Sequence, residues 1–511
     1  MNSLYNYINS FKDRQIRDDK TLEIVDGEFT VFIICDRKIE NDSLFTGEST
    51  VKSIVIRKYK SDCDGLVNEL YFFLNLSYRQ INKIPKYSLS RGANNQDKVF
   101  FEIIFPIDED LNHNDITSVI TAYKNEKIQQ IHNSFKLEDS QFIESDDIGI
   151  VQSNTKTRRL GYLKLIVELF ESSNYFPITY LGKRIETDSM FYNDALYEYG
   201  SRMGDDKGLI KKTDSGSSAK PYIQLLDQLN LLTQVNSSYI LTKQSKIYFQ
   251  LNKFLKQEID VVDANLFQLN LLDKLFFFRQ ILISDPLYIW VIIDIIFIAR
   301  KPIGTMSIKK LFVDYIKNEL DLSQAHSNNN ATKRKIIDLK TRISSWQKPL
   351  TYLEHIVEPR INWLVDLGIL ELKTESKEKL YYFSKSGLNL INVLFEILEK
   401  NLNKHLIIES VINNHYFYIF NYIFDLNKDK GSLDINKIEN YLLEAFQVFK
   451  TDAPNRIAAS QAIDYVCFKS FFDDNLIMEF EEIKKHLHRP NNKFSMDWFK
   501  TENDGALYLK K

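Results

Sequence analysis

Cysteine, proline and glycine are all scarce in this chain. Its 511 residues include 3 Cys, 10 Pro and 16 Gly. Three widely separated cysteines argue against the disulfide framework on which small secreted domains depend, so we expect a reducing, cytoplasmic location. Few Gly and Pro together with abundant Lys, Asn and Ile are typical of a protein from an A+T-rich bacterial genome.

A large excess of charge and a long apolar run are also missing. The formal net charge is −3 at pH 7, so any nucleic-acid surface has to be a local patch on a nearly neutral body. The apolar stretch Pro286–Arg300 is too short to span a bilayer and contains Asp294, which predicts a buried helix and no membrane association. The first twenty residues have no apolar run behind their positive charges and do not resemble a signal peptide.

The patterns that are present divide the chain in two. The composition, 44% hydrophobic and 13% aromatic, is that of a packed protein, and the length predicts two to four domains. Between Thr21 and Phe105, β-branched and aromatic runs bounded by polar turns predict strands, with one helix among them. From about residue 160 to Phe472, apolar residues recur at intervals of three and four, which predicts helices. We therefore expect a mainly α protein with small β-hairpins behind an N-terminal α+β domain.

Two helical segments match at an offset of 138 residues. PYIQLLDQLNLL begins at Pro221 and PRINWLVDLGIL begins at Pro359, and their Ile and Leu positions coincide. A shared proline suits the first helical position, where its missing N–H has no intrahelical partner. Each segment runs into a short strand, a polar turn and a second strand, and then TK or SK opens another helix. The second hairpin is four residues longer, which costs little because loop-closure entropy grows slowly with length.

This order of helix, hairpin and helix resembles the winged-helix family, a helix-turn-helix variant with a β wing. The resemblance covers residues 155–251 and 302–398. Three expected helices and a terminal hairpin suggest a third, winged-helix-like module. The strand and helix patterns, together with this resemblance, predict an N-terminal α+β domain (1–150), a first winged helix (151–255), a helical connector (256–301), a second winged helix (302–400) and a C-terminal helical domain with a hairpin (401–511).

The stretch KTDSGSSAKP, which precedes the first Pro-led helix, contains small residues of the kind that bind phosphate. It lacks the second Gly and the Gly-Lys-Ser/Thr ending of a P-loop, so ATP hydrolysis is not expected. We interpret it as the turn before the helix, with Ser217 or Ser218 as the N-cap.

The winged-helix resemblance implies contact with duplex DNA through the outer faces of the Pro-led helices. Leu225, Leu226 and Leu229 are expected to face the core, and Lys, Arg, Gln and Tyr side chains nearby can bind phosphates and base edges. The second helix is the weaker DNA reader because Glu358 and Asp366 accompany its arginine. Its basic preceding helix suggests non-specific contact or scaffolding. The predicted nucleic-acid-binding residues are Arg158, Arg159, Arg202, Lys207, Lys211, Lys212, Ser218, Lys220, Tyr222, Gln224, Gln228, Lys333, Arg334, Lys335 and Arg360.

An alternative is a metal-dependent, restriction-type nuclease with an N-terminal catalytic domain. Asp26 with Asp36 and Lys38 imitates a carboxylate pair with a lysine that holds a divalent metal and activates water. A polar strand end explains the same residues more simply, and no cofactor, metal site or small-molecule substrate is expected. Our leading hypothesis is a bacterial, non-catalytic protein that binds duplex DNA and protein partners or itself, within an antiphage defence or chromosome-maintenance assembly. A protein–protein adaptor without DNA binding is the third alternative.

Overall fold

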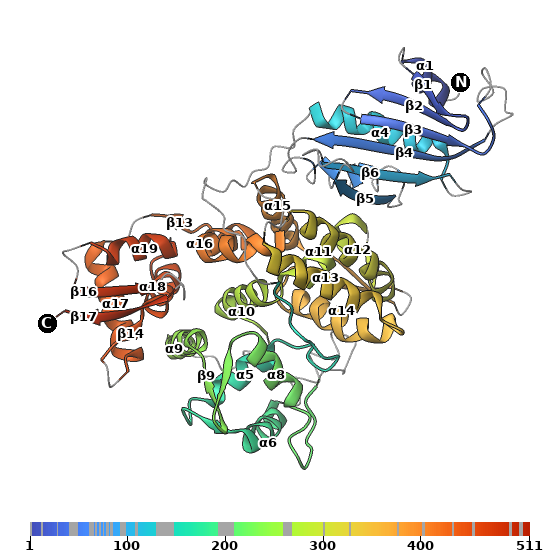
Figure 1. Cartoon of the computed structure of the whole chain (residues 1–511). Helices are drawn as coiled ribbons and strands as arrows, with labels where there is room; N and C mark the ends of the chain where they lie inside the picture. The colour runs from blue at the N-terminus through green and yellow to red at the C-terminus, as the bar shows by residue number, and fades with distance from the viewer. Residues whose placement is uncertain are drawn as a thin grey trace.

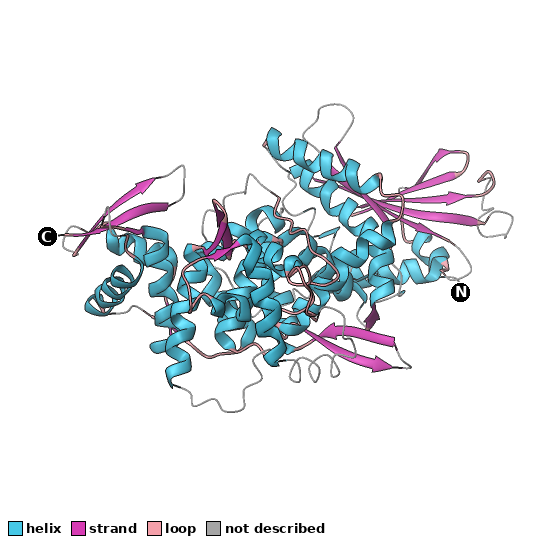
Figure 2. Cartoon of the chain, turned by 90° about the horizontal axis from the view of Figure 1, so that it is seen from below, coloured by secondary structure: helices cyan, strands magenta, loops and turns pink. Residues whose placement is uncertain are grey.

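The computed structural model of the chain has a large sheet at one end and a helical body with small sheets around it (Figure 1). Figure 2 shows helices making up most of the chain beyond the large sheet, with short strands among and beside them. Among the described residues no single helix is long and apolar enough to cross a membrane, although two helices bent by 103° pass that test together. The structure describes residues 3–11, 14–27, 29–39, 50–60, 85–91, 99–107, 111–128, 148–192, 209–258, 268–299, 302–326, 329–375, 378–400, 404–431, 434–451, 455–489, 493–499 and 504–510, with some residues between 66 and 81.

The N-terminal unit is an antiparallel sheet of six strands in the order β1-β2-β3-β4-β6-β5. Successive side chains of a strand point to opposite faces, and Val31 and Ile33 accordingly belong to a core that also contains Ile116 and Val119 of α4. The elements are α1 (Ser3–Asn9), β1 (Arg14–Asp18), β2 (Thr21–Asp26), β3 (Phe29–Cys35), β4 (Val51–Lys60), β5 (Lys86–Arg91), β6 (Val99–Pro106) and α4 (His113–Ile128).

Three helical units follow, and each contains a helix, a two-residue strand, further helices and a β-hairpin. The first unit has α5 (Gly161–Leu169), β7 (Phe176–Pro177), α6 (Ile178–Ser189), α8 (Lys220–Gln228), β8 (Leu232–Val235) and β9 (Ser238–Leu241). The second has α11 (Pro286–Ala299), β10 (Ile303–Gly304), α12 (Thr305–His326), α13 (Asn330–Ser344), α14 (Pro349–Asp366), β11 (Leu370–Glu375) and β12 (Glu378–Phe383). The third has α17 (Ile435–Phe449), β14 (Ile457–Ala458), α18 (Ala459–Asp473), α19 (Phe480–Leu487), β16 (Phe494–Phe499) and β17 (Asp504–Leu509).

The three small sheets share one topology. In each, the two-residue strand pairs with the second strand of the hairpin, giving the orders β7-β9-β8, β10-β12-β11 and β14-β17-β16. Together with the predominance of helix, this confirms a mainly α protein with small antiparallel sheets. The remaining elements are η1 (Met190–Tyr192), α9 (Lys243–Glu258), α10 (Leu271–Ser284), α15 (Lys385–Lys400), α16 (Lys404–Phe424) and the parallel pair β13 (Asp429–Lys430) and β15 (Leu476–Ile477).

The predicted internal repeat is visible in the backbone. Asn230 and Gly368, which are 138 residues apart, both follow their helices with a positive φ, 55° and 78°. A hydroxyl from the start of the next helix then bonds back to this turn in each unit. Thr242 Oγ1 donates to the Asn230 carbonyl, and Ser384 Oγ donates to the Gly368 carbonyl.

The expected helix start at Pro359 is wrong. Pro359 lies inside α14, which begins ten residues earlier with Pro349 in its first turn. A proline in a helix interior cannot donate to the carbonyl four residues before it, here that of His355. Ser153 Oγ donates to this carbonyl instead. A segment from outside the helix therefore compensates for the internal proline.

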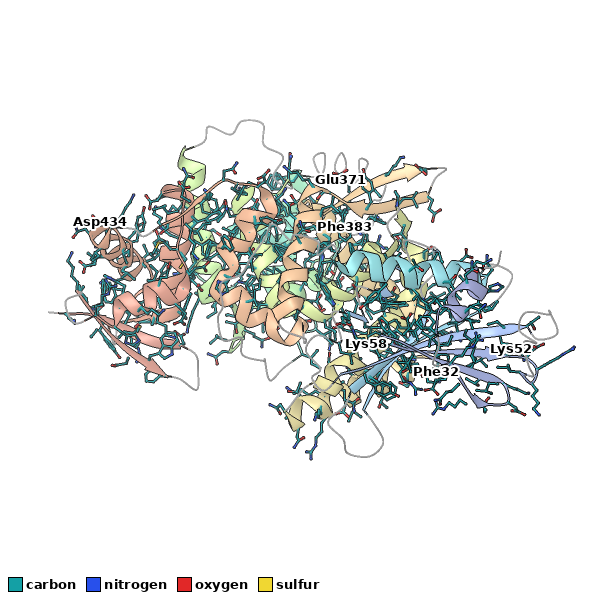
Figure 3. All side chains as sticks on the ribbon, turned by 90° about the horizontal axis from the view of Figure 1, so that it is seen from above. Phe32, Lys52, Lys58, Glu371, Phe383 and Asp434 are labelled. Carbon is teal, nitrogen blue, oxygen red and sulfur yellow. The ribbon has the colours of Figure 1, made fainter. Side chains whose placement is uncertain are left out.

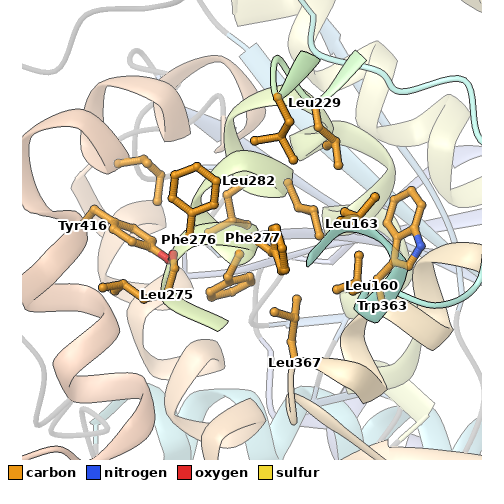
Figure 4. Packing of buried hydrophobic residues seen from close by; sticks show 14 of the residues in the cluster. Leu160, Leu163, Leu229, Leu275, Phe276, Phe277, Leu282, Trp363, Leu367 and Tyr416 are labelled. Carbon is orange, nitrogen blue, oxygen red and sulfur yellow. The ribbon is translucent and has the colours of Figure 1, made fainter. Parts of the chain in front are cut away.

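One continuous hydrophobic core joins all three helical units. It runs from Val151 to Leu507 and is separate from the core of the N-terminal sheet. Figure 4 shows Leu163 of the first unit near Trp363 of the second, and Phe276 of α10 near Tyr416 of α16. The core crosses the boundaries expected after residues 255, 301 and 400. The second half of the expected connector is α11, which serves as the first helix of the second unit.

Candidate nucleic-acid interface

The loop before α8 is held by a buried carboxylate of α6. Glu186 accepts hydrogen bonds from Thr213 N at 2.6 Å, Thr213 Oγ1 at 2.9 Å and Ser218 N at 2.8 Å. The loop also lies directly against α6, because an added Cβ on Gly182 would be 2.6 Å from the Gly216 carbonyl oxygen. Two N–H groups of the loop thus bind Glu186, and its carboxylate occupies the place that a bound phosphate would need.

The predicted N-cap of α8 is wrong. The N-cap residue is Ala219, without a side-chain hydrogen bond. Ser218 Oγ instead accepts a hydrogen bond from Lys211 N at 2.9 Å. Since Ser218 immediately precedes Ala219, this bond holds the exposed Lys211 beside the first turn of α8, with Lys212 next to it in the chain.

The outer face of α8 agrees with the sequence prediction at most positions. Leu225, Leu226 and Leu229 are buried as predicted, and Lys220 and Gln224 are exposed. The structure thus brings five predicted residues together at this helix end: Lys211, Lys212, Ser218, Lys220 and Gln224.

Tyr222 was predicted to face solvent and is instead fully buried. It lies three and four residues before Leu225 and Leu226, which places it on the apolar face of α8. Its ring centroid is 4.7 Å from that of Tyr162, and its hydroxyl accepts a hydrogen bond from Arg159 N. Burial raises the pKa of Tyr222 well above its usual range. Tyr222 is therefore a core residue and not a DNA contact.

The chain between Ile148 and Leu160, which we name the inter-helix segment, lies between α8 and α14. On the α8 side, Gln152 N donates to Gln228 Oε1. On the α14 side, Trp363 Nε1 donates to the Thr157 carbonyl at 2.6 Å, and Leu160 N donates to Asp366 at 2.9 Å. The segment therefore covers the face of α14 that was expected to read DNA.

Arg158 and Arg159 were predicted to contact nucleic acid and are instead buried in this junction. Arg158 pairs with Glu358, and Arg159 donates to Asn362 Oδ1 at 3.1 Å. Burying a charge is costly unless it is paired, and α14 supplies the acceptors for both guanidinium groups. In this arrangement neither arginine can neutralise a phosphate.

Arg360 was also predicted to contact nucleic acid, and its side chain is completely buried. It donates two hydrogen bonds to Asp285, at 2.6 and 2.9 Å, and one to the Val151 carbonyl at 2.6 Å. Its guanidinium also donates to Ser153 Oγ at 2.7 Å. Arg360 therefore joins α14, the α10–α11 junction and the inter-helix segment.

The remaining predicted cations lie on or near the surface, or outside the described residues. Arg334 and Lys335 of α13 are exposed and Lys333 is half-buried. Arg202 and Lys207 lie outside the described residues.

The third unit presents a basic surface that the sequence prediction missed. Lys485, His488 and Arg489 are exposed at the end of α19. Lys484 lies 4.1 Å from the centroid of the Trp498 ring in β16, which joins the helix to the hairpin. The sequence KKHLHR is the signal that could have indicated this surface. It ends a short amphipathic helix that begins with two glutamates, and a helix dipole favours acidic residues at the start and basic residues at the end.

The proposed nuclease site does not assemble. In the antiparallel sheet Asp26 pairs with Phe29 at one end of β3, whereas Asp36 and Lys38 follow the other end, about 20 Å away at 3.3 Å per residue. Asp26 is buried and accepts a hydrogen bond from Tyr7 at 2.7 Å, while Asp36 is exposed and its pKa is lowered by a hydrogen bond from Thr50 N. Two carboxylates so far apart cannot share a metal ion.

The buried lysine of this sheet is Lys58, which Figure 3 places on the strands. It pairs with Glu69, and Tyr123 donates to the same carboxylate at 3.2 Å. Within the described residues no group of three or more His, Cys, Asp or Glu side chains is placed to hold a metal ion. Comparisons with known families, curated proteins and solved structures found no match to the chain.

Proposed function

We propose that the three helical units are winged-helix modules and that the chain binds duplex DNA without cutting it. The repeated topology supports the first part, because a short strand pairs with the second strand of a hairpin three times. The observation that carries the second part is the end of α8, where Lys211, Lys212 and Lys220 are exposed beside Gln224. Lysines neutralise phosphates and a glutamine amide can bond a base edge, so this surface suits a major groove.

The basic surface of the third unit offers a second candidate contact for DNA. Asp464 of α18 accepts hydrogen bonds from Arg279 at 3.2 Å and from Gln244 at 2.7 Å. These bonds fix the third unit to α9 and α10 of the molecule. The corresponding helix face of the second unit, on α14, is covered by the inter-helix segment. We therefore assign this unit a structural role and no contact with the duplex through that face.

Fluorescence anisotropy with a labelled 20-base-pair duplex at low salt tests the proposal. We expect the triple variant Lys211→Ala, Lys212→Ala, Lys220→Ala to bind more weakly and to reduce the slope of log K against log salt by about 2.7, near 0.9 per lost phosphate contact. The matched control removes three exposed lysines elsewhere: Lys20, Lys52 and Lys373. Absence of binding to any duplex, or equal loss in the control, would overturn the proposal.

A protein-docking adaptor is the second candidate, and the inter-helix segment favours it. The outer face of α14 already holds a peptide segment through Glu358, Asn362 and Asp366, so this kind of helix face can bind protein. If the intact protein fails to bind duplex and co-purifies with a stoichiometric partner that the triple variant loses, the adaptor replaces the DNA-binding proposal. A nuclease predicts plasmid cleavage with magnesium that Asp36→Ala abolishes, and we expect none.

A further inference from the structure

The helix α13 lies between α12 and α14 of the second unit. Its buried positions Thr332, Ile336, Leu339 and Ile343 recur at three and four and seat the helix on α12. The opposite face is open to solvent. Residues 329–352 contain six Lys or Arg against a single acidic residue, Asp338.

The positive charge lies along the length of the exposed face. Arg334 and Arg342 are exposed and separated by eight residues, or about 12 Å at 1.5 Å per residue. Lys348 is exposed where α14 begins. Lys340 is not part of this surface, because it pairs with Asp321 of α12. The single acidic residue, Asp338, is exposed on the same face, four residues from each arginine. The row still has a net positive charge along its length, which suits a polyanion and not a single phosphate.

Two stacked aromatic rings stand at the end of this row. Trp346 follows the last turn of α13, and its ring centroid is 5.5 Å from that of Tyr352 at an interplanar angle of 19°. Trp346 packs against the core, whereas Tyr352 is 50% exposed. A tyrosine backed by a half-buried ring that packs on the core is a platform on which an unpaired base can stack.

We propose that α13 and the Trp346–Tyr352 pair bind single-stranded DNA, with the arginines on the phosphates and Tyr352 under a base. A duplex offers phosphates but keeps its bases stacked inside, so the aromatic pair distinguishes an unpaired strand from a duplex. The choice of DNA over RNA rests on the proposed function. The surface lies on α13 and the first turns of α14, apart from the end of α8, so the protein is able to hold a duplex and an unpaired strand at separate places.

Titration of a labelled dT20 oligonucleotide into the full-length protein tests this site. We expect Tyr352→Ala to weaken dT20 binding roughly 5- to 100-fold, since base stacking on an aromatic ring contributes that much. Tyr352→Phe keeps the ring and should bind as the parent does. Arg334→Ala with Arg342→Ala should lower the salt slope by about 1.4, near 0.7 per phosphate of a single strand. The matched control is Lys310→Ala with Lys373→Ala, two exposed lysines of the same unit.

The outcomes separate this inference from the proposed function. Duplex binding that Tyr352→Ala leaves unchanged, together with weakened dT20 binding, supports a separate single-strand site. Failure to bind dT20 while the duplex still binds overturns the single-strand site alone, and failure of both overturns both. Equal loss of duplex and dT20 binding in Tyr352→Ala makes this surface part of the duplex contact and overturns its independence. Tighter binding of a matched RNA overturns the assignment to DNA.

Discussion

Lys220, Gln224 and Gln228 on α8 correspond, at the offset of 138, to Glu358, Asn362 and Asp366 on α14. On α8 the first two of these side chains are exposed. On α14 all three positions accept hydrogen bonds from the inter-helix segment, two of them from Arg158 and Arg159. The same helix face therefore meets solvent in one unit and a basic peptide in the other. From α8 to α14, the lysine is replaced by glutamate and the two glutamines by asparagine and aspartate. These three replacements change what the helix face can bind.

The positions behind this face differ as well. Tyr222 and Arg360 are equivalent, and both are buried against the inter-helix segment. Tyr222 needs one hydrogen-bond partner, the N–H of Arg159, whereas Arg360 needs a carboxylate and several acceptors. The second unit therefore holds the inter-helix segment with a buried charged side chain, whereas the first unit holds it with a neutral one.

The largest expected effect comes from removing that charge. Arg360→Ala leaves Asp285 buried without its cation, which should lower the free energy of unfolding by about 3–5 kcal/mol. The exposed Arg334→Ala should change it by no more than about 0.5 kcal/mol. Guanidinium denaturation of both variants measures the difference.

Replacing both partners provides the control for this prediction. Arg360→Met with Asp285→Leu removes the buried pair and should recover much of the lost stability, because two apolar residues of similar volume often substitute for a buried ion pair. An Arg360→Ala variant as stable as the parent would mean that the junction between α14 and the inter-helix segment contributes little to the fold.

The sequence predicted the elements of this comparison better than their surroundings. Apolar spacing placed Leu225, Leu226 and Leu229 inside correctly, because this signal depends on neighbours within a few residues. The repeat located both helices but misplaced the start of the second, which lies ten residues before Pro359. Whether Arg158 and Arg360 are buried depends on their partners Glu358 and Asp285, which lie about 200 and 75 positions away in the chain. A single sequence contains no pattern that connects such distant charges, so exposed and buried arginines look the same. Tyr222 was different, since its spacing to the leucines already indicated burial.

A smaller effect is expected from the carboxylate that shapes the first unit's loop. Glu186→Gln replaces an acceptor of two N–H groups by a side chain that accepts through one oxygen only. We expect a loss of about 1.5–3 kcal/mol, the range for hydrogen bonds to a charged group. Faster proteolysis within residues 211–219, at unchanged secondary structure, would locate the loss in the loop.

The loop variant also sharpens the comparison between α8 and α14. Because the amide has one acceptor oxygen in place of two, either Thr213 N or Ser218 N loses its partner in Glu186→Gln. The loop should then hold Lys211 and Lys212 beside α8 less well, and duplex affinity should fall. Thr341→Val on the surface of α13 serves as a control that removes a helix-surface hydroxyl elsewhere. If Glu186→Gln loosens the loop but duplex affinity stays at the parent value, the lysines do not depend on the loop for their contact.

The smallest expected effect concerns how the third unit is held against α9. Asp504 of β17 accepts hydrogen bonds from Lys243 Nζ of α9 at 2.6 Å and from Ser460 N at 2.9 Å. Burial opposes its ionisation, but these bonds prevail and lower its pKa below the usual value for aspartate. A lowered pKa in the folded state means that the stabilisation is present above about pH 3.9, the ordinary value for aspartate, and is lost as the pH falls through the folded-state value. We expect Asp504→Asn to reduce stability above pH 5 and to differ less from the parent near pH 3. Thermal unfolding of both proteins from pH 2.5 to 6.5 measures the difference in stability between the parent and the variant. Other carboxyl groups titrate in both proteins, so their contribution cancels in this difference. A difference that stays constant over the whole range would show that the Asp504 charge does not hold the third unit to α9.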